Sequence, residues 1–443
     1  MLRGQRALVI GLAREGLDLS RFLLTHGANV VVTDRKSDAE LHEQVHLLGT
    51  DGVAYRLGGH SIDDLHNVDV VYASPGVPPE HELLQEAARR GITCSSLVEL
   101  FFALCPAPIL GVTGSSGKST TTSLIGEMFD RAERDVFVGG NIGRPLLGKL
   151  VDMRPSSWVV MELSSFQLEP LRTSPRIAVV TNVTPNHLDR HPSMEAYWEA
   201  KGQILAHQGP SDWAVLNADD PWSLRYRTNG RVLYFSLEGS VEGAYLAGRR
   251  LMLLGEPLLS TGDVPLRGRH NTANVLTAMA AAHAAGIQRE AMHEAIRAFE
   301  GVPHRLQTVA EREGVSYVDD SIATAPERSI AALQSYDEPL VLIAGGRDKH
   351  LPMDEWARLI VRRVKHVVLL GEMSELVAEA LRSAHPGYGA VSRAGSMDEA
   401  VRHAARAAST GDVVLLSPGG TSYDMYQDFE ERGRDFARAV HAL

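Results

Sequence analysis

Short apolar runs alternate with longer amphipathic stretches along almost the whole chain. Near the N-terminus, an apolar run predicts a strand over 6–11, a helical pattern follows over 17–26, and a second strand is expected over 28–33. Apolar runs bounded by turn residues are typical of buried strands, and strands that alternate with helices form parallel sheets. The pattern therefore predicts an α/β protein.

The length of the chain predicts more than one domain. A chain of 443 residues exceeds the size at which a single hydrophobic core keeps growing. We place three domains at residues 1–97, 98–302 and 303–443, with Rossmann-like units at both ends and a mostly parallel sheet in the centre. The regular pattern weakens only over 236–269, and an alanine-rich helix is expected after it over 271–286.

The central unit carries a glycine-rich turn directly after a strand expected over 109–113. Small residues let backbone N–H groups converge on an anion, a lysine meets terminal phosphates, and a hydroxyl can hold Mg²⁺ at a helix N-terminus. The longer form of this motif is excluded because Val112 stands where that form needs glycine. An ordinary loop before a helix is the alternative to a P-loop-type phosphate site for the segment Gly114-Ser115-Ser116-Gly117-Lys118-Ser119-Thr120.

Polar side chains follow other strands of the central unit. Glu162 ends an apolar run, and the loop after the next run contains His187 and Asp189. Opposite a P-loop we expect Glu162 to bind magnesium, although a solvent-facing strand end gives the same pattern. A loop histidine such as His187 often bonds only to backbone. Asn141, in a second glycine-rich turn, either approaches a substrate phosphate or sugar or belongs to a plain tight turn.

Two loops of the first unit point to a ligand. Gly11 and Gly16 resemble a dinucleotide-binding turn, but Ala13 stands where a middle glycine would admit a pyrophosphate, so a turn without ligand also fits. Asp34 could be a simple strand-end carboxylate. The polar turn over 73–78 lies at a strand end, where open α/β sheets bind ligands. Together these loops suggest a nucleotide-bearing ligand.

The third unit ends several strands in polar loops. Strands expected over 315–318, 340–344 and 412–416 bring these loops to one edge of a parallel sheet. In the helix before this unit, Asn271 or Asn274 can pair with an adenine edge, and helix capping by Asn271 is the alternative.

Composition excludes several classes of function. The 44 Lys and Arg residues against 55 Asp and Glu residues give a net charge of −11, which disfavours binding to nucleic acid or to an anionic membrane. Cys94 and Cys105 are too few for a disulfide framework or a four-cysteine zinc site. The apolar stretch 92–112 is interrupted by Glu99 and two prolines, so we expect no membrane insertion and a cytoplasmic protein.

In their order along the chain, these motifs resemble those of the Mur ligases of peptidoglycan synthesis, and the resemblance covers essentially the full length. Within that family the chain looks most like the members that add D-glutamate to UDP-N-acetylmuramoyl-L-alanine. The segments that carry the resemblance are Thr113–Thr120, Glu162–Glu169, Asn182–Asp189, His270-Asn271, Pro303-His304-Arg305 and Asp319-Asp320-Ser321.

The resemblance implies an ATP-dependent amide ligase that works through an acyl phosphate. ATP would phosphorylate the substrate carboxylate, and the amine of glutamate would displace phosphate, so catalysis depends on positioning and on neutralising charge. It also implies two magnesium ions and a carbamylated Lys201. From the residues alone, Lys201 reads as a surface lysine of a helix.

The resemblance assigns further residues to the expected sites. The residues implied in catalysis are Lys118, His187, Lys201 and Arg305. The ATP site would comprise Gly114, Ser115, Ser116, Gly117, Lys118, Ser119, Thr120, Asn271, Asn274, Arg305 and Asp320. The UDP-substrate site would comprise Arg14, Asp34, Ser74, Gly76, Asn141 and His187. Glutamate would meet Thr324, Lys349, Ser422, Tyr423 and Phe429, and the metal ligands would be Ser119, Thr120, Glu162, His187 and Lys201.

The chain departs from the family pattern at its third catalytic loop. Where the family commonly has Asp-Ser-Lys-Ala-Thr-Asn, this chain reads Asp-Ser-Ile-Ala-Thr-Ala over 320–325, and Ile322 cannot supply the missing charge. Alternatives are therefore ligation of L-glutamate, a folylpolyglutamate-synthase-like ligase, or a nucleotide sensor without turnover. We expect a monomer that binds these small molecules.

Overall fold

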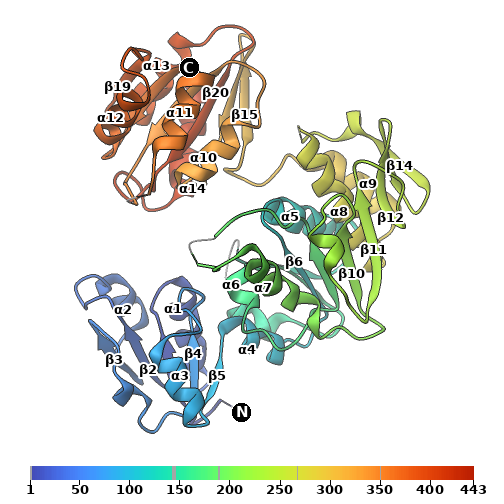
Figure 1. The fold of residues 1–443 in the computed structure, drawn as a ribbon, viewed down its shortest axis with the longest axis vertical. Coiled ribbons are helices and arrows are strands. Elements are labelled where there is room, and N and C mark those ends of the chain that lie inside the picture. The colour runs from blue at the N-terminus through green and yellow to red at the C-terminus, as the bar shows by residue number, and fades with distance from the viewer. Residues whose placement is uncertain (1, 142–145, 188–189, 267, 350) are drawn as a thin grey trace. The chain divides into compact units, whose positions relative to one another are not determined.

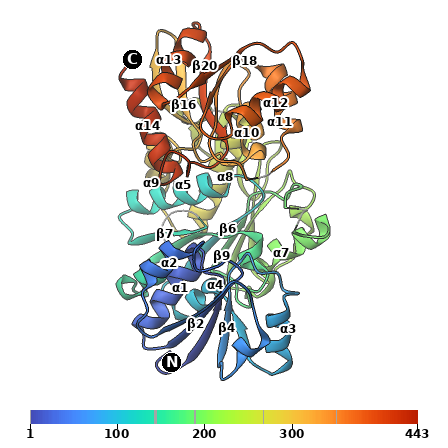
Figure 2. The ribbon, with the colours of Figure 1, turned by 90° about the vertical axis from the view of Figure 1, so that its left-hand side faces the viewer.

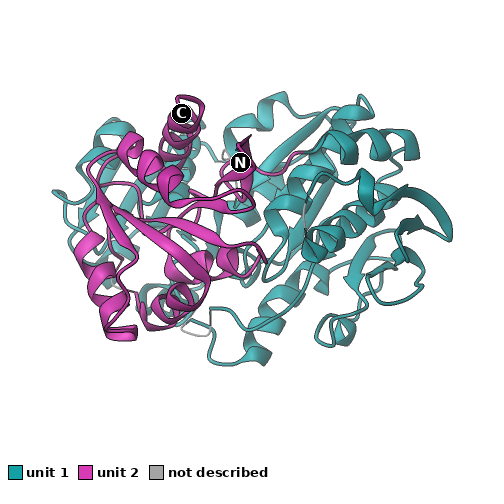
Figure 3. Cartoon of the chain, turned by 90° about the horizontal axis from the view of Figure 1, so that it is seen from above, with its two compact units in different colours: residues 1–299 teal, residues 300–443 magenta. Residues whose placement is uncertain are grey.

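Buried apolar runs form the strands of three β-sheets. The computed structural model describes residues 2–141, 146–187, 190–266, 268–349 and 351–443. These residues divide into two compact units, residues 1–299 and 300–443 (Figure 3). Unit 1 contains two of the sheets and unit 2 the third (Figure 1). The predicted three-domain α/β fold with mostly parallel sheets is confirmed.

The first sheet of unit 1 is parallel, with strand order β3-β2-β1-β4-β5. Its order reverses between β1 and β4, and in open α/β sheets this is where ligands bind. The strands are β1 (Arg6–Ile10), β2 (Asn29–Asp34), β3 (Val53–Leu57), β4 (Val70–Ala73) and β5 (Thr93–Ser95). The helices are α1 (Arg14–Thr25), α2 (His42–Leu48), η1 (Ile62–Leu65), α3 (Glu82–Arg89) and α4 (Leu97–Leu104).

The second sheet has the order β14-β13-β12-β11-β10-β9-β6-β8-β7, and only β13 and β14 join it antiparallel. Its strands are β6 (Ile109–Thr113), β7 (Val136–Gly140), β8 (Trp158–Glu162), β9 (Ile177–Val180), β10 (Trp213–Asn217), β11 (Arg231–Ser236), β12 (Gly243–Ala247), β13 (Arg250–Leu253) and β14 (Glu256–Ser260). Its helices are α5 (Lys118–Arg131), η2 (Leu147–Asp152), α6 (Ser165–Leu168), α7 (Met194–Ala206), η3 (Ser223–Arg225), η4 (Thr261–Asp263), α8 (Arg269–Ala284) and α9 (Arg289–Ala298).

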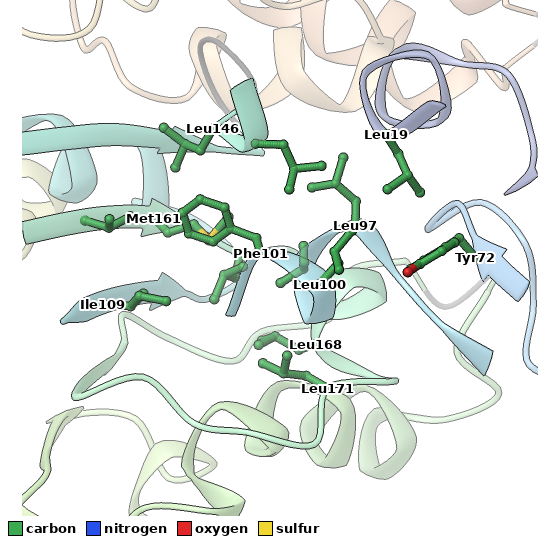
Figure 4. Close-up of a cluster of buried hydrophobic side chains, with 14 of the residues drawn as sticks. Leu19, Tyr72, Leu97, Leu100, Phe101, Ile109, Leu146, Met161, Leu168 and Leu171 are labelled. Atoms are coloured by element: carbon green, nitrogen blue, oxygen red, sulfur yellow. The ribbon is translucent and has the colours of Figure 1, made fainter. Parts of the chain in front are cut away.

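The apolar helix α4 connects the two sheets of unit 1. Leu97, Leu100 and Phe101 of α4 belong to one buried cluster with side chains of both sheets and of the helices on them (Figure 4). Phe101 is fully buried, and burying such a side chain stabilises a fold by about 2–3 kcal/mol. The apolar stretch 92–112 is therefore core. None of the described helices combines the length and apolar character that crossing a bilayer requires.

The sheet of unit 2 has the order β15-β16-β20-β17-β18-β19, and only β15 is antiparallel. Helices α10, α11 and α12 pack on one face, and α13 and α14 pack on the other (Figure 2). The strands are β15 (Gln307–Arg312), β16 (Val315–Asp319), β17 (Leu340–Gly345), β18 (Val364–Leu370), β19 (Val391–Ala394) and β20 (Val413–Gly419). The helices are α10 (Pro326–Leu333), α11 (Asp354–Arg363), α12 (Ser374–Ala384), α13 (Met397–Ala407) and α14 (Phe429–His441).

Candidate active site

The loop after β6 depends on two glycines and leads into the N-terminus of helix α5. Gly114 and Gly117 have φ values of 148° and 80°, which favour glycine. A Cβ on Gly114 would overlap Thr181 Oγ1, and one on Gly117 would overlap Asn274 Oδ1. The first backbone bond of α5 runs from the N–H of Thr121 to Gly117 O (3.0 Å). The earlier amides therefore lie at a helix N-terminus, which attracts an anion.

Asn182 holds this loop from the end of β9. Its Oδ1 accepts the N–H of Ser116 (3.0 Å), its Nδ2 donates to Ser116 O (3.1 Å), and its backbone oxygen accepts the N–H of Ser115 (2.9 Å). Thr181 Oγ1 also donates to Ser116 O (2.6 Å). The expectation that successive amides face an anion therefore fails for Ser115 and Ser116, because both N–H groups donate to Asn182.

Two lysines meet on one carbonyl oxygen of the loop. Lys118 Nζ donates to Gly114 O (2.9 Å) and to Ser115 O (3.2 Å), and Lys201 Nζ donates to the same Gly114 O (2.9 Å). Burial lowers the pKa of Lys201 well below its usual range, the Lys118 charge lowers it further, and Glu162 opposes both. Lys201 is 1% exposed. The interpretation of Lys201 as a surface lysine is wrong.

The register of α7 explains the burial of Lys201. The inward residues of α7 are spaced by three and four, as on one face of a helix, and Lys201 occupies one of these positions. The ring centroid of Tyr197 lies 4.4 Å from Lys201 Nζ, and the hydroxyl of Tyr197 lies 3.1 Å from Ser115 Oγ. The inward residues are Tyr197, Ala200, Lys201, Ile204 and Leu205.

Glu162 presents an unfilled carboxylate oxygen beside the loop. The side chain is 2% exposed, and its Oε1 accepts a hydrogen bond from Asn141 Nδ2 (2.7 Å). Among the described residues, its buried Oε2 has no hydrogen-bond partner. A buried carboxylate oxygen without a donor is costly, and a hard cation such as Mg²⁺ would satisfy it. Ser119 and Thr120, both nearly buried, start the adjacent helix. The donor set therefore fits magnesium, although no group of three or more His, Cys, Asp or Glu side chains in the described ranges could hold a metal.

His187 lies in an aromatic cluster near α7. Its backbone has φ of 55°, and its ring centroid is 5.2 Å from Phe166 and 6.4 Å from Tyr197. His191 is buried against the same Phe166, and its Nε2 lies 3.0 Å from Ser165 Oγ. His187 is exposed. Asp189 of the same motif lies outside the described residues.

Asn274 lies against the phosphate loop from helix α8. Its Oδ1 faces Gly117, and its Nδ2 donates to Asn271 Oδ1 (3.1 Å). The alternative that Asn271 caps this helix is wrong, because α8 begins at Arg269 after Gly268, and Asn271 already lies inside its first turn.

A cavity of about 580 Å³ opens where the first sheet of unit 1 reverses its order. Ser74 Oγ donates to Gly11 O (3.2 Å) across the reversal. The carboxylate of Asp34 accepts hydrogen bonds from the N–H groups of Leu12 (2.8 Å) and Lys36 (2.9 Å). It therefore holds the loops around it in addition to lining the cavity. The predicted residues that line the cavity are Arg14, Asp34, Ser74, Gly76 and Asn141, whereas His187 is not among its lining residues.

Two long-range hydrogen bonds involve residues that line this cavity. Gln167 Nε2 donates to Glu15 Oε1 (2.7 Å), and both side chains line the cavity. Arg190 donates to Gly76 O (3.1 Å). Burial raises the pKa of Glu15 above its usual range. Asn141, which follows β7, lines the cavity, whereas residues 142–145 lie outside the described residues.

The polar edge of unit 2 lies at the ends of three neighbouring strands, as predicted. Asp320 follows β16, and its Oδ2 accepts the hydroxyl of Ser417 on β20 (2.8 Å) while its Oδ1 accepts the N–H of Leu306 (3.3 Å). Burial raises the pKa of Asp320 to about 7. His304 Nδ1 lies 2.6 Å from Asp319 Oδ2. Arg305, next to His304, has a charge that lowers the pKa of Asp320 and partly offsets its burial.

The residues expected to meet glutamate surround the same edge. Lys349 Nζ donates to Thr324 Oγ1 (3.3 Å). Ser422 is buried and Tyr423 is 63% exposed. Phe429 begins α14, and its ring lies 6.3 Å from that of His304.

Full-length relatives identify the family. Models of the Mur ligase MurD-like N-terminal domain, the Mur ligase middle domain and the Mur ligase glutamate ligase domain match residues 5–96, 112–282 and 304–420. A UDP-N-acetylmuramoylalanine--D-glutamate ligase from Symbiobacterium thermophilum is 42% identical, covering 99% of this chain and 98% of that protein. One of the same name from Pelotomaculum thermopropionicum is 43% identical with the same coverage. The chain belongs to the Mur ligase family.

Solved structures of distant Mur ligases share the fold of this Mur ligase. The UDP-N-acetylmuramate-alanine ligase of Thermotoga maritima matches with a TM-score of 0.60 at 18% identity, covering 99% of each chain. A pseudomurein peptide ligase type C from Methanothermus fervidus matches with a TM-score of 0.56 at 16% identity, covering 99% of this chain and 100% of that one.

Some residues of this ligase escaped the sequence prediction. Asn182 belongs to one of the motifs in the sequence, but its hydrogen bond to Ser116 forms only because β6 pairs with β9. The sequence alone does not show this pairing. Gln167 and Glu15 are 152 residues apart and meet only in the fold. The burial of Lys201 had a signal in the sequence, because Tyr197, Ile204 and Leu205 place it on the apolar face of its helix.

Proposed function

We propose that this Mur ligase joins D-glutamate to UDP-N-acetylmuramoyl-L-alanine at the expense of ATP, in peptidoglycan precursor synthesis. The single observation that best supports this proposal is the position of Asn141. Its side chain lines the cavity of unit 1 and donates to Glu162, whose second oxygen has no hydrogen-bond partner in the described part of the chain. A nucleotide-sugar substrate in the cavity would then bring its carboxylate toward the γ-phosphate of ATP.

The chemistry follows from that juxtaposition. A free carboxylate is a poor acyl donor, so transfer of the γ-phosphoryl group to one carboxylate oxygen supplies phosphate as a leaving group. The neutral amine of glutamate attacks the carbonyl carbon, the C–O bond to phosphate breaks, and the amine loses a proton as the amide forms. Lys118 and the amides that begin α5 would stabilise the charge on the transferring group.

We propose that Glu162, Ser119 or Thr120, His187 and a carbamylated Lys201 hold magnesium at this site. Bound magnesium neutralises the charge of phosphate oxygens. Carbamylation would turn a buried amine into a carboxylate-like ligand. The burial of Lys201 on Gly114 O, close enough to Glu162 for their charges to interact, supports this proposal.

The remaining assignments are also proposals. They are the roles of Asn271, Asn274, Arg305 and Asp320 toward ATP, the domain limits 1–97, 98–302 and 303–443, a monomeric state and a cytoplasmic location. Light scattering of the purified chain would test the monomer.

Phosphate release tests the proposed reaction. Release should require ATP, magnesium, UDP-N-acetylmuramoyl-L-alanine and D-glutamate together, and mass spectrometry should find the amide product. ATP hydrolysis that is independent of both other substrates would contradict the proposal.

Carbon-13 NMR tests the carbamate separately. The protein equilibrated with ¹³C-bicarbonate should show a carbamate carbon signal that is absent from Lys201→Met. An identical signal in both proteins would place the modification elsewhere.

A further inference from the structure

The loop after β16 lacks a cation in its own sequence but receives one from helix α10. Ile322 occupies the position at which the family resemblance leads one to expect lysine. The backbone oxygen of Ile322 accepts a hydrogen bond from Arg328 NH1 (3.2 Å) and another from the N–H of Thr324 (2.8 Å). The guanidinium of Arg328 therefore contacts the backbone of Ile322, the position that has no charged side chain.

A second cation reaches the same short segment from the loop after β17. Lys349 Nζ donates to Thr324 Oγ1 (3.3 Å), two residues beyond the carbonyl that Arg328 contacts. Burial lowers the pKa of Lys349, and the charge of Arg328 lowers it further, whereas Glu327 opposes both. Within the described ranges, neither Arg328 nor Lys349 forms an ion pair with a carboxylate. Two like charges held together, with neither in an ion pair among the described residues, are typical of a site for an anion.

A third cation nearby, Arg432, is buried and hydrogen-bonded within the fold. Arg432 is 3% exposed and donates to Ser321 Oγ (2.9 Å), Ser321 O (2.8 Å) and Gly420 O (3.1 Å). Its guanidinium joins the loops after β16 and β20. Arg432 therefore shapes this edge from a buried position, whereas the side chains of Arg328 and Lys349 are exposed.

We propose that Arg328 and Lys349 form a paired cationic site for the two carboxylates of glutamate, with Arg328 supplying the charge that Ile322 lacks. The inference rests on the proposed function and adds to it a substrate-binding residue. With one N–H of the guanidinium fork on Ile322 O, others remain to meet a carboxylate in the planar geometry that arginine favours.

The charge of the reacting amino acid matches this pair. Glutamate attacks with a neutral amine, and in that form its two carboxylates give it a net charge of −2. Two cations balance this charge. Nearby positive charge also disfavours an ammonium group, so the pair promotes the nucleophilic form of the substrate.

Steady-state kinetics of the full chain test the assignment. Arg328→Ala should raise the KM for D-glutamate by about 10- to 100-fold, because a charge-assisted hydrogen bond is lost. The KM values for ATP and for the UDP substrate should stay within about twofold, and Arg328→Lys should be affected less. Glu327→Gln should lower the KM for D-glutamate, because the Glu327 carboxylate interacts with Lys349 and would repel the carboxylates of the substrate. Arg402→Ala, which removes an exposed arginine of α13, should match the wild type.

A double variant that moves the positive charge from residue 328 to residue 322 gives the most specific test. The double variant Ile322→Lys with Arg328→Ala restores a cation to the loop and should recover part of the affinity for D-glutamate. An unchanged KM for D-glutamate in Arg328→Ala, or an equal rise in the KM for ATP, would overturn the assignment while the reaction stands. If Arg328→Ala fails to fold, the other two variants test the assignment. Arg328→Lys should raise the KM for D-glutamate and Glu327→Gln should lower it. A wild-type protein without turnover of D-glutamate would contradict the proposed function itself.

Discussion

At the scale of single residues, a lysine and an aspartate show how burial changes chemistry. Lys201 is buried on the backbone of the phosphate loop, and burial lowers its pKa. Asp320 is buried between the loops of unit 2, and burial raises its pKa to about 7. Both shifts favour the neutral form of the group, in which an amine can be carbamylated and a carboxylic acid can donate a proton.

Lys201→Met should lower kcat by roughly a hundredfold or more, because an electrostatic contribution to the transition state of this size is typical of one well-placed group. The melting temperature should not fall, because the variant no longer buries an ionisable amine. Activity assays with thermal unfolding check both expectations. Lys149→Met is the matched control, because Lys149 is an exposed lysine whose only described ion pair is with Asp152 at 3.6 Å. Full activity in Lys201→Met would contradict the assigned role.

Asp320 should make stability fall as pH rises from about 4 to about 7. An unfolded aspartate titrates near about 3.9. Between that pH and about 7, the folded chain holds a proton on Asp320 that the unfolded chain has lost, so the free energy of unfolding decreases with pH and levels off above about 7. In urea unfolding, the stability of Asp320→Asn relative to wild type should therefore increase from about pH 4 to 7. A constant difference across this range would show that Asp320 titrates normally in the folded protein.

At the scale of elements, the phosphate loop depends on strands that are distant in sequence. Glycine at 117 is required both by its φ of 80° and by the proximity of Asn274, and Asn182 holds the loop through Ser116. The loop is therefore positioned by β9 and α8 as well as by its own glycines.

Gly117→Ala should abolish ATP binding, because a Cβ would overlap Asn274 in a backbone conformation that alanine rarely adopts. Gly148→Ala is the control, since a Cβ there meets nothing within 4 Å. Calorimetric titration with a non-hydrolysable ATP analogue compares the two. Equal affinity for the analogue in Gly117→Ala and wild type would contradict the account of the loop.

Asn182→Ala should weaken ATP binding about tenfold, since the variant removes the hydrogen bonds from the Asn182 side chain to the N–H and the carbonyl oxygen of Ser116. Its affinity for UDP-N-acetylmuramoyl-L-alanine should stay unchanged. Calorimetry with each ligand measures the two affinities. A parallel loss of both would indicate a general defect in folding.

Local patterns predicted most of these elements. The apolar runs that became β6, β8, β16 and β17 were recognised from their bounds, because a buried parallel strand is a nearly continuous apolar run. The strands β12, β13 and β14 were missed, because glycine and proline interrupt them and β13–β14 pair antiparallel at a sheet edge. The contacts of Asn182 and Arg328 depend on side-chain positions in three dimensions and could not be predicted from spacing.

At the scale of the whole molecule, the chain forms two compact units, and the proposed sites are divided between them. Unit 1 contains the phosphate loop, Glu162 and the cavity, with the apolar helix α4 packed between its two sheets. Unit 2 contains the polar edge with Lys349 and Arg328. The three family models match segments of both units.

The choice between glutamate isomers tests the central claim most directly. Purified protein with ATP, magnesium and UDP-N-acetylmuramoyl-L-alanine should release phosphate in proportion to added D-glutamate, and the product should contain one D-glutamyl residue. L-Glutamate should give a rate at background. Phosphate release with L-glutamate that equals or exceeds release with D-glutamate would contradict the account, as would no release with either isomer.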